Sequence, residues 1–125
     1  YREGPRRLIS TVQPGTENTG GSWIWSGDGP PPEGSIEVPA VTLEGIRLSH
    51  GMPHLALLQL DCEGCELQVL QHARLDSVRQ IVGEFHDRQA FLNLVAERLP
   101  GWTLRIVQDG EPGLFWLVQR NRAWR

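Results

Sequence analysis

The stretch that decides the fold is residues 55–70, which read LALLQLDCEGCELQVL. It opens with an almost unbroken apolar run, which is typical of a strand buried on both faces of a parallel sheet. The run stops at an acidic corner that contains a glycine, and an apolar pattern with helical spacing follows. An open α/β sheet binds its ligand at the carboxyl ends of its strands. The acids of this corner, Asp61, Glu63 and Glu66, therefore fall where a binding crevice is expected.

Strands and helices alternate around this stretch. From residue 43 onward the sequence predicts, in order, a helix at 43–49, a strand at 55–60, a helix from 63 or 65 to about 73, a strand at 78–85, a helix at 88–99 and two hairpin strands at 102–107 and 114–118. Thr42 and Asp87 are suited to cap the first and third of these helices. The alternation predicts an α/β fold, in which helices pack on a parallel sheet that is closed by an antiparallel C-terminal hairpin.

Residues 1–34 are rich in loops, with short strands expected at 8–12 and 23–25 and a stiff proline-rich connector at their end. The segment 35–43 reads as a strand. Because Pro39 lacks a backbone N–H, this strand is expected at a sheet edge or at a bulge. So much loop is unusual at the start of a domain, and the sequence does not begin with methionine. We therefore expect that neighbouring segments of the native protein are missing from this chain.

Composition excludes several classes of protein. A formal charge of -3, with no lysine and scattered arginines, provides no footprint for nucleic acid. No apolar run approaches the roughly 20 residues that a membrane span needs, so no membrane contact is expected. Two cysteines are too few for a disulfide scaffold, and the default expectation is a cytoplasmic protein with reduced thiols.

Polar side chains follow both predicted parallel strands. Right-handed crossovers bring the carboxyl ends of these strands to one rim, where neighbouring strands lie roughly 5 Å apart. Four side chains are expected to converge there: Asp61, Glu63, Glu84 and His86. Such a cluster can accept hydrogen bonds from ligand hydroxyls or amines, hold a divalent cation, or deprotonate a hydroxyl. The alternative is helix capping, in which Asp61 and Glu63 satisfy the free N–H groups of the helix that follows.

Three segments resemble the C-terminal half of FkbM-type methyltransferases. They are residues 38–46, VPAVTLEGI, residues 57–70, LLQLDCEGCELQVL, and residues 81–86, IVGEFH. The family carries V-x-x-V-T-L-D, then L-L-K-I-D-V-E-G-A-E-x-x-V-L, then a strand that ends in E-x-H. The resemblance implies S-adenosylmethionine-dependent O-methylation of a small-molecule hydroxyl, commonly on a sugar or a polyketide-like secondary metabolite. It also implies a Rossmann-like sheet, of which residues 35–125 would form the C-terminal half after the loop-rich segment 1–34.

The resemblance also suggests roles for individual residues. Asp61, Glu63 and Gly64 match the family's acidic corner, and Glu84 and His86 match the end of its next strand. Asp61, Glu63, Gly64 and Glu84 are therefore expected to bind cofactor or substrate, without a metal. For the base that takes the proton from the acceptor hydroxyl, His86 is the first choice, because an unperturbed imidazole titrates near neutral pH. Glu63 is the second choice, and Asp61 also belongs to the catalytic set. In the alternative, His86 is a rim histidine that bonds a neighbour or solvent.

The chain departs from the family pattern in ways that bear on activity. No glycine-rich turn follows a strand and opens a helix, so the cofactor-binding half of the family is not found in these residues. Gln59 stands where the family has Lys, and Glu44 stands where it has Asp. Cys62 and Cys65 occupy positions that usually hold Val and Ala. The chain by itself is therefore expected to bind S-adenosylmethionine poorly and to be inactive.

Three other functions are compatible with parts of the sequence. Cys62 and Cys65 form a C-x-x-C pair between a strand and a helix, as in thioredoxin-like redox proteins, although reduced and unreactive cysteines are the favoured interpretation. His50 and His54 together with these cysteines have the composition of a zinc site. The third alternative is a non-catalytic binding module of methyltransferase fold. An exposed sheet edge would then favour pairing with a second copy of the chain.

Overall fold

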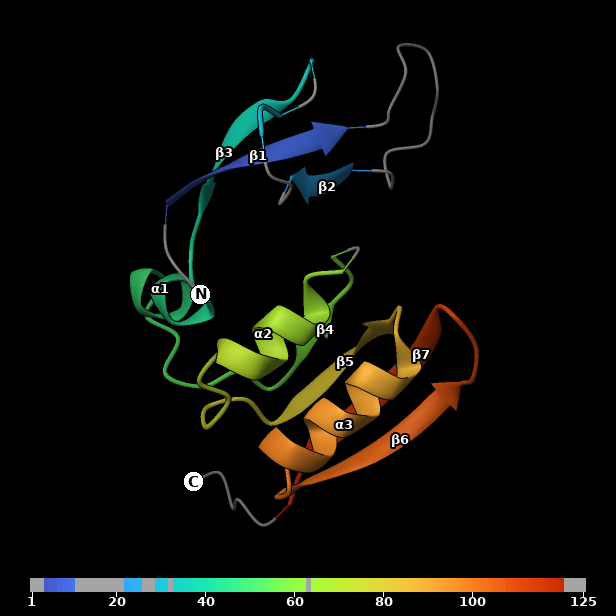
Figure 1. Ribbon diagram of the computed structural model, residues 1–125. Helices are drawn as coiled ribbons and strands as arrows, with labels where there is room; N and C mark the ends of the chain where they lie inside the picture. The colour runs from blue at the N-terminus through green and yellow to red at the C-terminus, as the bar shows by residue number, and fades with distance from the viewer. Residues whose placement is uncertain (1–3, 11–21, 26–28, 32, 63, 121–125) are drawn as a thin grey trace. The chain divides into compact units, whose positions relative to one another are not determined.

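A computed structural model of the protein describes residues 4–10, 22–25, 29–31, 33–62 and 64–120 (Figure 1). The chain forms two compact units, Arg2–Thr42 and Leu43–Arg125. The sequence analysis placed the boundary after residue 34. The structural division falls later because the strand predicted at 35–43 pairs with the N-terminal segment and not with the α/β sheet.

The first unit is a three-stranded antiparallel sheet of order β2-β1-β3. Its strands are β1 (Gly4–Ser10), β2 (Ser22–Trp25) and β3 (Ile36–Ala40). In the register of the sheet, Pro39 of β3 lies opposite Pro5 of β1. The position of Pro39 on an edge strand agrees with the prediction, since a residue without a backbone N–H is tolerated at an edge.

The second unit contains the α/β fold. Its elements in chain order are α1 (Leu43–Ser49), β4 (Leu58–Leu60), α2 (Glu66–His72), β5 (Gln80–Phe85), α3 (Arg88–Arg98), β6 (Trp102–Gln108) and β7 (Gly113–Gln119). They form a four-stranded sheet of order β4-β5-β7-β6 (Figure 1). β4 and β5 are parallel, whereas β7 is antiparallel to both of its neighbours. The predicted α/β fold with a closing antiparallel hairpin is confirmed, and its mixed sheet is consistent with part of the Rossmann-like sheet that the resemblance implies.

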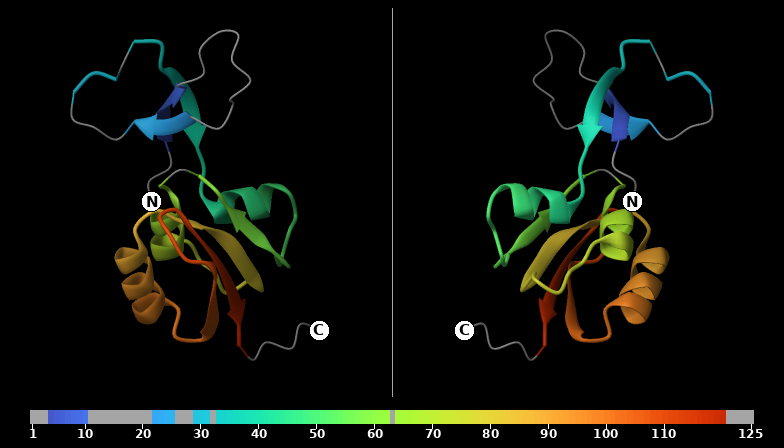
Figure 2. Two further views of the ribbon diagram at one scale, coloured as in Figure 1. Left: turned by 90° about the vertical axis from the view of Figure 1, so that its right-hand side faces the viewer. Right: turned by 90° about the vertical axis from the view of Figure 1, so that its left-hand side faces the viewer.

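The hydrophobic core lies between this sheet and the helices α2 and α3, which pack on the same face (Figure 2). Phe91 of α3 is fully buried and stacks on Phe85 of β5, with ring centroids 5.1 Å apart. Its ring centroid also lies 4.5 Å from that of Phe115 in β7. Alternate residues of β5 point to the opposite face, where Val82 and Glu84 are only half-buried. The core therefore fixes which side chains of each strand remain available to a ligand.

The central strand differs from its prediction. The apolar run 55–60 was expected to form one strand buried on both faces, but β4 covers only Leu58–Leu60. Leu55 makes an isolated parallel bridge with Val78, and the side chain of Leu57 is 53% exposed. The physical reason is that β4 is the edge strand of the four-stranded sheet, so the sheet pairs with it on one side only.

Candidate functional site

A groove of about 320 Å³ lies where β4 and β5 end. Leu60 and Gly83 are partners in the parallel register, so the residues that follow them, Asp61 and Glu84, are neighbours across the two strands. Both of these acidic residues line the groove. Most of its other lining residues are apolar, among them Val82, Val107, Leu114, Phe115 and Trp116. The groove therefore combines an apolar wall with two carboxylates, which is the composition of many small-molecule sites.

Gly83 explains how the two strands come so close at this point. A Cβ atom at this position would overlap the carbonyl oxygen of Leu60, and it would lie 3.1 Å from the Phe115 ring. Only glycine leaves room for this approach without moving the backbone. The glycine in the IVGEFH segment therefore supports the adjacency of Asp61 and Glu84.

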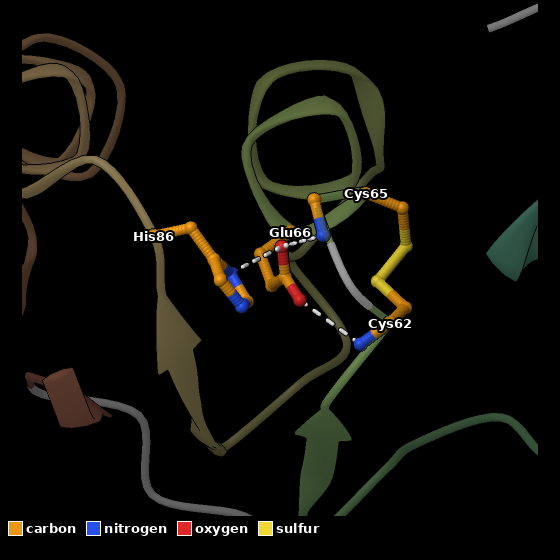
Figure 3. The surroundings of a disulfide bond; sticks show 5 residues. Cys62, Cys65, Glu66 and His86 are labelled. Carbon is orange, nitrogen blue, oxygen red and sulfur yellow. Dashed lines mark hydrogen bonds and ion pairs between the residues drawn. A yellow bond between two sulfur atoms is a disulfide. The ribbon is translucent and has the colours of Figure 1, made fainter. Parts of the chain in front are cut away.

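His86 lies apart from the residues that line the groove. Its Nδ1 atom is 3.8 Å from Oε2 of Glu66, at the start of α2 (Figure 3). The His86 side chain is 34% exposed, whereas that of Glu66 is only 3% exposed. Of the four side chains expected to converge, the structure thus brings Asp61 and Glu84 to one groove and places His86 against α2. The fourth, Glu63, lies outside the described residues.

Glu66 holds the corner between β4 and α2 together. Its carboxylate accepts hydrogen bonds from the backbone N–H groups of Cys62 and Gly64, each at 2.9 Å (Figure 3). Gly64 has a φ of +104°, a conformation that residues with a side chain rarely adopt, and this allows the chain to turn around the carboxylate. The N-cap residue Cys65 provides no side-chain cap. Glu66 therefore satisfies two backbone N–H groups of the corner that precedes α2. Asp61, which the capping alternative invoked, is exposed.

The sequence analysis placed Glu66 near the crevice but assigned it no role. The available signal was the third acid of the D-x-E-G-x-E pattern, since a carboxylate just after a glycine corner can turn back onto the amides of that corner. What the pattern does not contain is the burial of the side chain. With 3% exposure and two backbone donors, Glu66 is a structural carboxylate of the site.

The two cysteines form a disulfide, Cys62–Cys65, with their Cα atoms 5.4 Å apart. The expectation of reduced cysteines is therefore wrong for this structure. It followed from the number of cysteines and an assumed compartment, whereas the corner itself brings the two Cα atoms into the range in which disulfides form. The bond also removes the two thiolates from the zinc alternative. Among the residues that the structure describes, no group of three or more His, Cys, Asp or Glu residues is placed to hold a metal ion.

Comparison with known families identifies the domain. Residues 9–108 match the model of the family described as the methyltransferase FkbM domain. The chain belongs to the FkbM methyltransferase family. The match extends well beyond the segments that carry the resemblance in the sequence, and it includes β2, β3 and the last two residues of β1. No curated protein and no solved structure matches this chain. Within the described part of this FkbM domain, no helix is long and apolar enough to cross a membrane.

Membership in this family implies S-adenosylmethionine as the methyl donor. Its carboxylate would need free backbone N–H groups at a turn into a helix. The amides of Cys62 and Gly64 already donate to Glu66, so this corner offers no such cradle. Asp61 and Glu84 can accept hydrogen bonds from hydroxyl or ammonium groups. The described residues therefore provide acceptors for single polar groups but do not fit the whole cofactor.

Proposed function

We propose that the protein catalyses S-adenosylmethionine-dependent O-methylation of a hydroxyl on a sugar or a secondary metabolite. In this proposal the FkbM domain described above forms the acceptor side of the active site, and the methyl donor binds mainly to segments outside the described residues. The observation that carries the proposal is the groove that is lined by Asp61, directly after β4, and by Glu84, near the end of the neighbouring parallel strand β5. Open α/β sheets bind their ligands at this edge.

The groove suits a molecule with a polar edge and an apolar face. Two neighbouring carboxylates, Asp61 and Glu84, can accept hydrogen bonds from adjacent hydroxyl groups of one ring. The half-buried side chains of Val82, Leu114 and Trp116 provide a surface against which the C–H face of the ring can pack. This combination supports a polyhydroxylated ring as the acceptor and distinguishes it from a purely apolar ligand.

Methyl transfer to a hydroxyl also needs a group that takes the proton. We assign this role to His86, which lies two residues after Glu84, just beyond the end of β5. Because His86 does not line the groove, the proposal requires that the reacting hydroxyl of the acceptor extends out of the groove to the imidazole. Its imidazole lies against the buried Glu66 carboxylate, which limits the orientations that the ring can adopt. A positioned base contributes roughly 10²–10⁴-fold to such a reaction. Glu63 remains the second candidate for the base.

The test is transfer of a tritiated methyl group from S-adenosylmethionine by the protein as its gene encodes it, with a panel of monosaccharides and hydroxylated macrolides as acceptors. We expect transfer to at least one polyol. Asp61→Asn should lower the rate by roughly tenfold or more while the free energy of unfolding stays within about 1 kcal/mol of the parent, because Asp61 is exposed. The matched control is Glu97→Gln, an equal change at an exposed position of α3, which should leave the rate unchanged. An Asp61→Asn variant with full activity would refute the assignment of the groove.

A second candidate, a non-catalytic binding module, is supported by one observation. The corner amides are occupied by Glu66, and the described residues provide no cradle for the cofactor. In that case the edge strand β4 would pair with a second copy of the chain. Calorimetric titration with S-adenosylhomocysteine separates the two functions. Binding favours the enzyme, whereas absence of binding together with a dimer in sedimentation favours the module.

A further inference from the structure

The disulfide lies in the corner that supports the candidate base. Cys62 and Cys65 are both half-buried, so a small thiol reagent can approach their sulfur atoms. Cys65 is the N-cap of α2, and the next residue is Glu66. The S–S bond therefore closes a four-residue ring directly before the carboxylate that faces His86.

The backbone of this ring forms the binding seat of the Glu66 carboxylate. One carboxylate oxygen accepts from the N–H of Cys62 and the other accepts from the N–H of Gly64, and both donors are inside the ring (Figure 3). The oxygen that binds Gly64 is also the one that lies 3.8 Å from Nδ1 of His86. The disulfide, the carboxylate and the imidazole thus form one continuous series of contacts.

We propose that Cys62 and Cys65 form a reversible redox switch that sets the positions of Glu66 and His86. The reductant is a dithiol. One of its thiolates attacks one cysteine sulfur, the Cys62–Cys65 bond breaks, and the other cysteine leaves as a thiolate that takes a proton from solvent. The second thiolate of the reductant then displaces the first cysteine, which is protonated in turn. Two electrons pass to the protein, which gains two thiols, and the dithiol becomes a disulfide.

Opening the ring loosens the corner. Gly64 has no Cβ atom, so its backbone has access to both positive and negative φ values once the ring is open. The disulfide closes a ring of four residues and so lowers the conformational entropy of the open corner. Loss of this restraint corresponds to an increase of up to roughly twentyfold in the equilibrium constant for opening the corner. The hydrogen bonds from Cys62 and Gly64 to Glu66 should therefore open more often after reduction, and the orientation of His86 should become less restricted.

A structural disulfide without a regulatory role would act differently. It would change the global stability of the domain without changing the surroundings of His86 specifically. The consequence for methyl transfer rests on the proposed function, because it needs His86 as the base. The local effect of the redox state on the corner does not depend on that assignment.

The experiment is nuclear magnetic resonance on ¹⁵N-labelled protein, oxidised and then treated with dithiothreitol. We expect roughly tenfold faster hydrogen exchange at the amides of Cys62 and Gly64 and shifted imidazole ¹⁵N resonances of His86, with no change at the amide of Phe91 in the core. This chain has only two cysteines, so within it dithiothreitol acts at this pair alone. A disulfide that resists reduction in the folded protein, or reduction without these local changes, would overturn the proposal.

A variant with Cys62→Ser and Cys65→Ser provides the second measurement. It should reproduce the resonances of the reduced protein and should not respond to dithiothreitol. In the methyl-transfer assay, reduction of the parent should lower kcat several-fold, whereas the double variant should have the low kcat under both conditions. If the resonances respond but no methyl transfer is found with any acceptor, the switch stands and the proposed function fails. Local changes with an unaltered kcat would refute the regulatory role.

Discussion

Replacing Glu66 with glutamine tests how much the corner depends on one buried carboxylate. The carboxylate accepts two backbone N–H groups at 2.9 Å, from Cys62 and Gly64. A glutamine side chain has a single oxygen, so one of these donors would face an NH₂ group and lose its partner. A buried donor without a partner costs about 1–3 kcal/mol.

Two smaller losses add to this cost. The remaining hydrogen bond loses the assistance of a charge, and the negative charge near the first turn of α2 is removed, which contributes about 0.3–1 kcal/mol. One effect acts in the opposite direction. The Glu66 side chain is only 3% exposed, and a neutral amide costs less free energy to bury than a charged carboxylate. We therefore expect Glu66→Gln to lower the free energy of unfolding by about 2–3 kcal/mol.

The assay is urea unfolding followed by circular dichroism, with the midpoint and the slope fitted separately. Glu97→Gln makes the same chemical change at an exposed position and should stay within about 0.5 kcal/mol of the parent. An unchanged slope is needed to attribute the shift of the midpoint to stability. A loss below about 0.5 kcal/mol for Glu66→Gln would refute the argument that this carboxylate holds the corner.

The other predictions concern the frame around the site. Gly83→Ala adds a Cβ atom that overlaps the carbonyl oxygen of Leu60, so it should cost about 2 kcal/mol or more in urea unfolding, whereas Gly101→Ala, with nothing within 4 Å of the added atom, should cost nothing. Equal losses for these two variants would contradict the close approach of β4 and β5. Asp87→Ala removes the N-cap side chain that accepts a hydrogen bond from the backbone of α3, so it should lower the free energy of unfolding by about 1 kcal/mol in thermal melts. Asp87→Asn should keep most of the capping stabilisation, because asparagine is also a good N-cap residue. Phe91→Ala should cost about 3–5 kcal/mol by calorimetry, and a loss below about 1 kcal/mol would exclude a central place for this ring in the core.

The sequence by itself determined the features that depend on neighbouring residues. Asp87 followed by an apolar stripe predicted α3, and its side chain does accept from the backbone N–H of Ala90 at 2.9 Å. Thr42 and the residues after it predicted α1 at Leu43–Ser49, and the turn chemistry at 109–113 predicted the β6–β7 hairpin. Capping, periodicity and turn preferences act over a few residues, so they can be read from a linear pattern. The acidic corner and the strand ending in Glu84-Phe85-His86 likewise indicated the family that the match over residues 9–108 supports.

Only the tertiary structure decided which partners the site residues have. The apolar run that contains Leu57 reads as a buried strand, but strand order makes β4 an edge, and no local pattern contains that order. Glu66 is buried against two amides because Gly64 adopts a positive φ, and His86 lies against Glu66 because β5 runs parallel to β4. The same corner brings the two cysteines into bonding range, although counting cysteines indicated free thiols. Burial, strand order and proximity arise from contacts between residues far apart in the chain or from the path of the backbone, and a one-dimensional pattern specifies neither of these.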